Sequence, residues 1–382
     1  MSGIEVVICL VLLLMAVPDV CRKLGRPALA FSIFAVFGIA LGPVVSPGVR
    51  TMILQAGQVG FLLLLFEVGL EIDLPRFREL LPPLRYAVVW SLVQYPLVFG
   101  LGWLVGLSPM ECLVGAAALT ACSVGMAYPA WKGYSGITAD TRHFILNVMV
   151  VLETIAILLL AVETVALEKG VSGLIFLKLS GILVTVFLIA RFSVRLTELF
   201  QAVLERTTRW RVHFLVLLIL VVCALGERLG LDAAKTAFFL GLFMSHARHD
   251  GRRLEEYMAP ISHGFLIPTF FVALGLRVDW HLFLDPLAWF AIGTALVLIG
   301  VRQVLHRRWL PTGGGDRAFL LLCPNLTIVA LAANAMLDHG TDPRLGAWLV
   351  LTGLFMTVTA IFLLPAEIMT GSRPHHCDPR PG

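Results

Sequence analysis

Charged residues are scarce in this chain. Asp, Glu, Lys and Arg make up 14% of the 382 residues, whereas a soluble domain usually carries about a quarter. No long polar stretch remains that could fold as a separate soluble domain. The net charge of only +4 gives no sign of a nucleic-acid partner. These shortages exclude an ordinary soluble protein.

Cysteine pairs and catalytic motifs are also missing. None of the seven cysteines forms a CxxC pair, and most lie inside apolar runs, which is typical of small core residues rather than disulfides or metal ligands. The sequence contains no HExxH motif, phosphate-binding glycine loop or Ser-His-Asp arrangement. We therefore expect no enzyme activity, no metal and no cofactor.

Long apolar runs dominate instead, and hydrophobic residues make up 58% of the chain. A membrane-spanning helix needs about 20 mostly apolar residues, and in lipid each backbone polar group must be satisfied within its own segment. The sequence therefore predicts an all-α polytopic membrane protein in a lipid bilayer. About 13 spans are expected, at residues 4–21, 28–44, 51–70, 86–106, 110–129, 140–165, 171–191, 210–227, 231–246, 259–276, 283–305, 317–337 and 345–368.

Basic residues alternate between the predicted loops. With the N-terminus outside, the inner loops hold most of the Lys and Arg residues. The outer loops hold only Arg50, Lys169, Arg228, Arg277 and Arg344. Because basic loops stay in the cytoplasm, we expect a multi-pass protein of the cell inner (plasma) membrane, with the N-terminus outside and the C-terminus cytoplasmic. The polar, Pro-rich residues 372–382 are expected to form a disordered cytoplasmic tail.

Small and hydroxyl-bearing residues, among them Thr120 and Ser123, crowd the middle of the fifth span at residues 118–126. Gly125 and Pro129 weaken a helix there. An unwound helix at membrane depth frees backbone carbonyl groups that can coordinate an ion. Tight helix packing through small residues explains the same composition, so both interpretations stay open.

One carboxylate, Glu153, lies near the middle of the sixth span with apolar residues on both sides. Such a group must be protonated, paired, or facing a polar cavity, and intramembrane carboxylates commonly mark ion or proton pathways. Glu153 and its neighbour Thr154 are therefore candidates for a transport site. The alternative is a structural salt bridge.

The third polar region combines Arg302, late in the eleventh span, with Pro324, Asn325 and Thr327 in the twelfth. Pro324 interrupts its span much as the Gly125 region interrupts the fifth. Breaks at corresponding positions of two halves indicate inverted repeats that meet at a midplane site. Alternatively, Arg302 extends its guanidinium toward the inner interface, next to Arg307 and Arg308.

At these positions the chain resembles the bacterial monovalent cation/proton antiporters of the sodium/hydrogen exchanger superfamily, particularly the branch of potassium-efflux and sodium/proton antiporters. The order and spacing of several short motifs carry the resemblance. They are LGRPAL at 24–29, GIALGP at 38–43, LFEVGLEID at 65–73, TACSVG at 120–125, AFFLGLFMS at 237–245 and FFVALGL at 270–276.

The resemblance implies one transmembrane domain over residues 1–371, with two crossed, discontinuous helices. Panel helices at about 4–70 and 210–276 would make a homodimer interface, core helices at about 86–165 and 283–368 would move against them, and a linker helix would cover 171–191. It also implies a site of Glu153, Thr120, Ser123, Thr154, Arg302, Asn325 and Thr327. Glu153 would stand where the family has its essential aspartate, and Arg302 where many members have lysine.

Some positions depart from the family pattern. Leu152 replaces the aspartate, asparagine or glutamine that usually precedes the carboxylate, and the twelfth span lacks the family's Arg-Gly-Glu pattern. We expect antiport of a proton and a monovalent cation, Na⁺ or K⁺, by alternating access. Two alternatives are the same fold exporting another solute and a transport-inactive membrane sensor or assembly protein with Glu153 and Arg302 ion-paired.

Overall fold

The structure is a computed structural model of the chain. It describes residues 3–26, 29–71, 81–134, 138–169, 211–228, 233–244, 248–249, 252–254, 258, 261–309 and 317–364. The predicted span at 171–191 and the predicted tail at 372–382 therefore lie outside the described residues.

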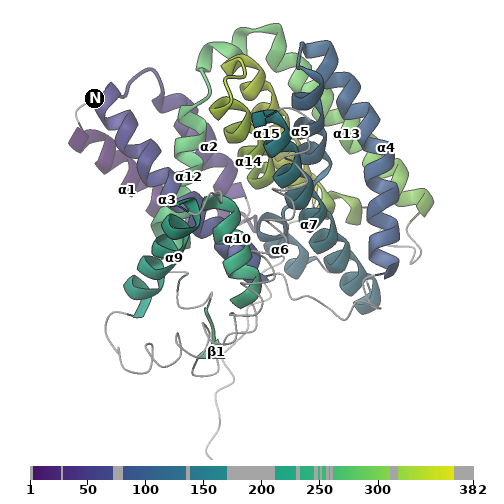
Figure 1. The fold of residues 1–382 in the computed structure, drawn as a ribbon, viewed down its shortest axis with the longest axis horizontal. Coiled ribbons are helices and arrows are strands. Elements are labelled where there is room, and N and C mark those ends of the chain that lie inside the picture. The colour runs from purple at the N-terminus through teal and green to yellow at the C-terminus, as the bar shows by residue number, and fades with distance from the viewer. Residues whose placement is uncertain are drawn as a thin grey trace, which may run out of the picture.

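The helices gather into two groups that lie side by side (Figure 1). The first helix group consists of α1 (Gly3–Lys23), α2 (Leu29–Leu41), α3 (Pro47–Glu71), α9 (Arg211–Arg228), α10 (Ala233–Met244), the π-helical turn η1 (Ser262–Leu266) and α12 (Ile267–Leu276). Within it, α3 packs against α10 and α12, and α2 packs against α12.

The second helix group consists of α4 (Leu81–Val105), α5 (Pro109–Thr120), α6 (Val124–Gly133), α7 (Ala139–Lys169), the 3₁₀ turn η2 (Trp280–Leu284), α13 (Pro286–Trp309), the 3₁₀ turn η3 (Ala318–Leu322), α14 (Leu326–Asp338) and α15 (Pro343–Leu363). Here α5 packs against α4 and α7, and α15 packs against α13 and α14. The two groups meet where α2 contacts α15 and α3 contacts α6. A two-residue antiparallel ladder joins β1 (Arg248–His249) to β2 (Arg252–Arg253).

Seven helical segments of the described residues are long and apolar enough to cross a membrane. Large apolar side chains such as Leu12, Leu104 and Trp289 lie exposed on their outer faces, as expected of surfaces that contact lipid rather than water. Each predicted span except 171–191 coincides with a described helix or helix pair. The prediction of an all-α polytopic membrane protein is confirmed, and the count of 13 spans remains approximate.

Two spans are interrupted, as predicted. α5 ends at Thr120 and α6 begins at Val124, with extended backbone at Ala121 and Ser123. The break therefore precedes Gly125, which lies inside α6. In the twelfth span, η3 and α14 are separated by 323–325, where Pro324 lacks the N–H that an uninterrupted helix needs.

Glycine permits close contact between helices in the first helix group. A Cβ atom at Gly38 of α2 would lie 2.1 Å from the carbonyl oxygen of Val272 in α12, and one at Gly275 would lie 2.0 Å from that of Ala35. The backbones of α2 and α12 thus touch at a distance that no other residue allows, as in small-residue packing between membrane helices.

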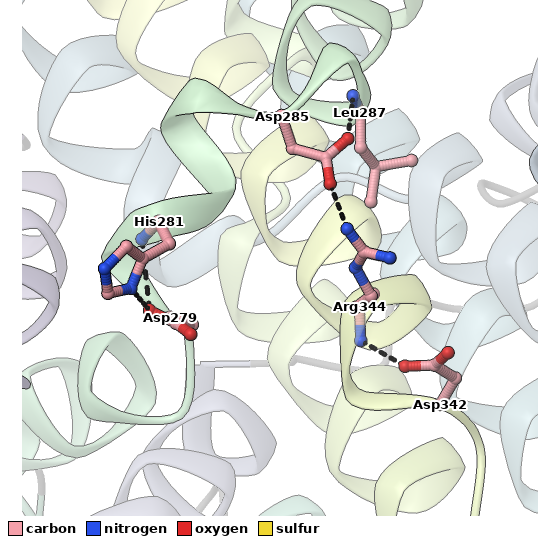
Figure 2. Close-up of polar contacts among 6 residues, drawn as sticks. All are labelled: Asp279, His281, Asp285, Leu287, Asp342 and Arg344. Atoms are coloured by element: carbon pink, nitrogen blue, oxygen red, sulfur yellow. Dashed lines mark hydrogen bonds and ion pairs between the residues drawn. The ribbon is translucent and has the colours of Figure 1, made fainter.

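Polar contacts hold the starts of α13 and α15 together at one end of the molecule (Figure 2). The Asp285 carboxylate accepts a hydrogen bond from the Leu287 N–H, 3.0 Å away, and forms an ion pair with Arg344. Asp342 caps α15 by accepting the Arg344 N–H at 2.9 Å. These bonds satisfy N–H groups that a helix start leaves unpaired.

Candidate functional site

The two interrupted spans cross at their breaks. The Ser123 N–H donates to the Pro324 carbonyl over 2.7 Å, and the Thr327 hydroxyl donates to the Ser123 hydroxyl over 2.5 Å. The Asn325 amide donates to the Leu119 carbonyl, 3.3 Å away. Backbone groups that have no helical hydrogen bond in one broken segment thus find a partner in the other segment.

Arg302 of α13 fills the crossing point and is fully buried. Its guanidinium donates to the Leu322 carbonyl at 2.8 Å, to the Leu119 carbonyl at 2.5 Å and to the Gln94 side chain at 2.9 Å. It also lies 5.4 Å from the centre of the Trp90 ring. Because Leu119 and Leu322 are at the C-terminal ends of α5 and η3, the cation meets the negative ends of two helical segments.

Glu153 of α7 lies on the other side of the break, where α6 begins. It is fully buried, and its Oε2 atom accepts the Val124 N–H over 2.9 Å. This N–H is the first of α6, and a helix N-terminus attracts negative charge. The Ser123 side chain lies beside the same carboxyl group.

Glu153 and Arg302 do not pair with each other. No hydrogen bond or ion pair joins the two side chains in the part of the chain that the structure describes. The arginine instead binds Gln94 and backbone carbonyls, while the glutamate binds the start of α6. The ion pair expected of a transport-inactive protein is therefore not found between these residues.

Two buried oxygen atoms at the crossing have no hydrogen-bond partner among the described residues: Oε1 of Glu153 and Oδ1 of Asn325. Buried polar atoms are nearly always satisfied by protein, water or an ion. The carboxylate and amide oxygens are hard ligands of the kind that alkali and other hard cations prefer.

Two of the sequence-predicted residues use their hydroxyl groups elsewhere. The Thr120 hydroxyl donates to the Ala116 carbonyl over 2.8 Å, and the Thr154 hydroxyl donates to the Val150 carbonyl over 2.8 Å. Both bonds stay within their own helices. Ser123 and Thr327 bond to each other across the crossing, Asn325 bonds to the Leu119 carbonyl, and Arg302 reaches the same carbonyl.

Sequence reasoning missed three polar residues of this site: Gln94, Trp90 and Thr357. Gln94 accepts from Arg302, the Trp90 Nε1–H donates to the Thr120 carbonyl over 3.3 Å, and the Thr357 hydroxyl accepts the Asn325 N–H over 3.3 Å. Gln94 interrupts an apolar run, so the criterion that selected Glu153 would also have found it. Nothing in the local sequence of Thr357 marks it.

Other buried carboxylates lie away from the crossing. Glu163 is on α7, ten residues beyond Glu153, and is buried. Glu67 of α3 is buried and lies 3.0 Å from the half-exposed imidazole of His263 in η1. Within the described ranges, no group of three or more His, Cys, Asp or Glu side chains could hold a metal ion.

Comparisons with known proteins identify relatives of the chain. The chain is 26% identical over 374 residues to the "Probable Na(+)/H(+) antiporter 3" of Methanocaldococcus jannaschii, covering 92% of this chain and 91% of that protein. It is 29% identical over 233 residues to the high-affinity Na⁺/H⁺ antiporter NhaS3 of Synechocystis, covering 58% of this chain and 49% of that protein.

Among solved structures, the sodium proton antiporter MjNhaP1 of Methanocaldococcus jannaschii has a similar fold. The TM-score is 0.65 at 12% sequence identity, over 94% of this chain and 95% of that one. The sequence profile described as "Sodium/hydrogen exchanger, transmembrane" matches residues 8–365, which is nearly the whole chain. This chain belongs to the sodium/hydrogen exchanger family.

Proposed function

We propose that this protein exchanges a monovalent cation for a proton across the membrane by alternating access, with Glu153 as the carboxylate that both bind. The observation that supports this most is the buried Oε1 atom of Glu153, which has no partner among the described residues. A carboxyl group in such a place must gain a proton or a cation, because a bare buried charge is very costly. The two would exclude each other, and that competition would couple their opposite flows.

Nearby oxygen atoms would complete the cation site. Oδ1 of Asn325 is buried and without a partner in the described chain, and the hydroxyls of Ser123 and Thr327 are bonded to each other beside it. Thr120 at the end of α5 and Thr154 next to Glu153 on α7 would contribute through their positions rather than through free hydroxyls. Arg302 would act as a positioning residue, since it holds the two helix ends rather than the carboxylate.

The two helix groups would be the moving parts. We propose that the first helix group is the panel that forms a homodimer, and that the second carries Glu153 past it. The linker would be the segment at 171–191. The protein would lie in the plasma membrane with its C-terminus in the cytoplasm, as the distribution of basic residues predicts.

The cation would be Na⁺ or K⁺. The relatives of this chain include proteins named as Na⁺/H⁺ antiporters and, in Bacillus cereus, a protein 23% identical to this chain that is named as a Na⁺/H⁺–K⁺ antiporter. Leu152, which is buried beside Glu153, offers no oxygen ligand and favours a second candidate, in which the same fold exports an organic solute.

The test is proton flux in proteoliposomes challenged in turn with Li⁺, Na⁺ and K⁺. Glu153→Gln removes the titratable group but keeps its shape, and we expect it to abolish exchange. Glu163→Gln is a matched control, because it makes the same change at a buried glutamate on the same helix about 15 Å away, and it should retain exchange.

Full exchange by Glu153→Gln would overturn the assignment. Proton-coupled uptake of an organic solute without any response to the three cations would favour the second candidate instead.

A further inference from the structure

A small hollow opens between the two helix groups, away from the helix crossing. It lies between α3, α12 and α14 and is partly open to solvent, and its cavity volume of about 20 Å³ leaves room for about one water molecule. Its lining includes the side chains of Gln58, Phe61, Phe270, Arg277 and Asn334. Arg277 follows the end of α12, which the predicted orientation places at the outer side of the membrane.

The lining of the hollow combines apolar side chains with the polar side chains of Gln58, Arg277 and Asn334. The rings of Phe61 and Phe270 stack with their centres 5.0 Å apart. Oδ1 of Asn334 is buried and lacks a hydrogen-bond partner within the described residues. Buried polar atoms are nearly always satisfied by protein, water or an ion, so a water molecule or an ion in the hollow would give this oxygen a partner.

Helix α14 contributes a residue to the hollow and another to the proposed cation site. Asn334 lies seven residues after Thr327 on that helix. Seven residues are close to two full turns, so the two side chains share one helix face and are separated by about 10 Å along the axis. Thr327 in turn bonds to Ser123 beside Glu153. One face of α14 therefore carries both Asn334 of the hollow and Thr327 of the proposed cation site.

Arg277 brings a positive charge to this rim that no ion pair with a described carboxylate cancels. The nearby Asp279 is engaged with His281 (Figure 2), whose backbone N–H and ring nitrogen lie 3.0 Å and 2.9 Å from its Oδ1 atom. These bonds from His281, the backbone one foremost, hold the pKa of Asp279 below its usual value. Arg50 donates to the Leu276 carbonyl at 2.7 Å and adds charge of the same sign.

We propose that Arg277 weakens the binding of cations that enter from the outer side, acting at an entrance whose inner oxygen ligand is Asn334. This inference rests on the proposed antiport function. For a separation on the order of 10 Å and an effective dielectric constant of about 40, a fixed positive charge lowers the local binding of a cation about fourfold. Such weakening on one side favours release of the cation into the outer medium.

The kinetic test compares half-saturating cation concentrations in right-side-out and everted membrane vesicles. Arg277→Gln should lower the half-saturating cation concentration on the outer side about fourfold and leave the maximal rate unchanged. The difference from the wild type should disappear at high ionic strength, because salt screens exposed charges. Arg277→Lys should behave like the wild type. Arg344→Gln is the matched control, because it removes one arginine charge at a residue that does not line the hollow.

The proposal would be overturned if Arg277→Gln left the outer half-saturating cation concentration unchanged, or if Arg344→Gln changed that concentration equally. If the wild type showed no cation-dependent proton flux at all, the antiport function itself would have failed, which is a separate and recognisable result.

Thiol labelling tests the position of the entrance without any transport. Gln58→Cys should react with a membrane-impermeant maleimide added to intact cells, above the background of the wild type, in which five of the six described cysteines are buried. Leu284→Cys, exposed in η2, and Leu24→Cys, exposed after α1, mark the expected outer and inner sides. Labelling of Gln58→Cys from the inner side alone would refute an outer entrance.

Discussion

Arg302 shows how one side chain can complete a helix crossing. Its guanidinium supplies donors for carbonyls at the ends of both α5 and η3, and Gln94 accepts a further bond. Arginine suits this position better than lysine, because its planar group has five donors in a fixed arrangement. The sequence predicted a buried ionisable residue here, but left open whether it would pair with Glu153, bind elsewhere or extend toward the inner interface.

We expect Arg302→Met to destabilise the protein by about 3–5 kcal/mol, because it leaves several buried carbonyls without donors. Arg302→Lys should fall between that variant and the wild type, since it keeps the charge and loses the planar group. Thermal unfolding in detergent measures the effect, with the exposed Arg308→Gln as control. A normal melting temperature for Arg302→Met, with exchange lost, would instead assign Arg302 a direct role in transport.

At the scale of elements, the sequence identified both interrupted helices and the position of the break at Pro324, but it misplaced the break between α5 and α6. Pro324 explains the break before α14 by itself. The break between α5 and α6 lies at 121–123, before Gly125 and Pro129, the two residues that the sequence predicted to weaken the helix. It is held by bonds from Arg302, Asn325 and Thr327, which come from elsewhere in the chain, and a local pattern cannot contain such partners.

The α2–α12 contact gives a prediction at this scale. Gly38→Ala would place a methyl group 2.1 Å from the Val272 carbonyl oxygen, so the two helices must separate, and we expect a loss of about 2 kcal/mol. Gly100→Ala on α4 is the control, because nothing lies within 4 Å of a Cβ there and alanine favours helix over glycine. Thermal unfolding of the two variants should show a clear loss only for Gly38→Ala.

At the scale of the whole molecule, the charge carried per cycle follows from the number of carboxylates in the site. Glu153 is the one carboxylate among the described residues at the crossing, and Arg302 binds Gln94 and backbone carbonyls instead of this carboxylate. One proton should therefore replace one cation, and no net charge should cross the membrane.

We accordingly expect exchange in proteoliposomes to be insensitive to an imposed membrane potential of either sign. Movement of one net charge through 100 mV would change the free energy by about 2.3 kcal/mol, which is a large effect on rate. A strong acceleration by inside-negative potential would require a second charge in the cycle, and Glu163 and Glu67 would be the first residues to replace.

The sequence alone determined the membrane location, the helical class and the position of nearly every span, because lipid demands long apolar helices with internally satisfied backbones. It also marked Glu153, Arg302 and the two breaks, because polar groups are rare and costly at that depth. Tertiary structure alone decided which groups pair. Arg302 binds helix ends rather than Glu153, and Gln94, Trp90 and Thr357 join the site. Partners such as these lie up to about two hundred residues away along the chain, and only folding brings such distant donors and acceptors within hydrogen-bonding distance.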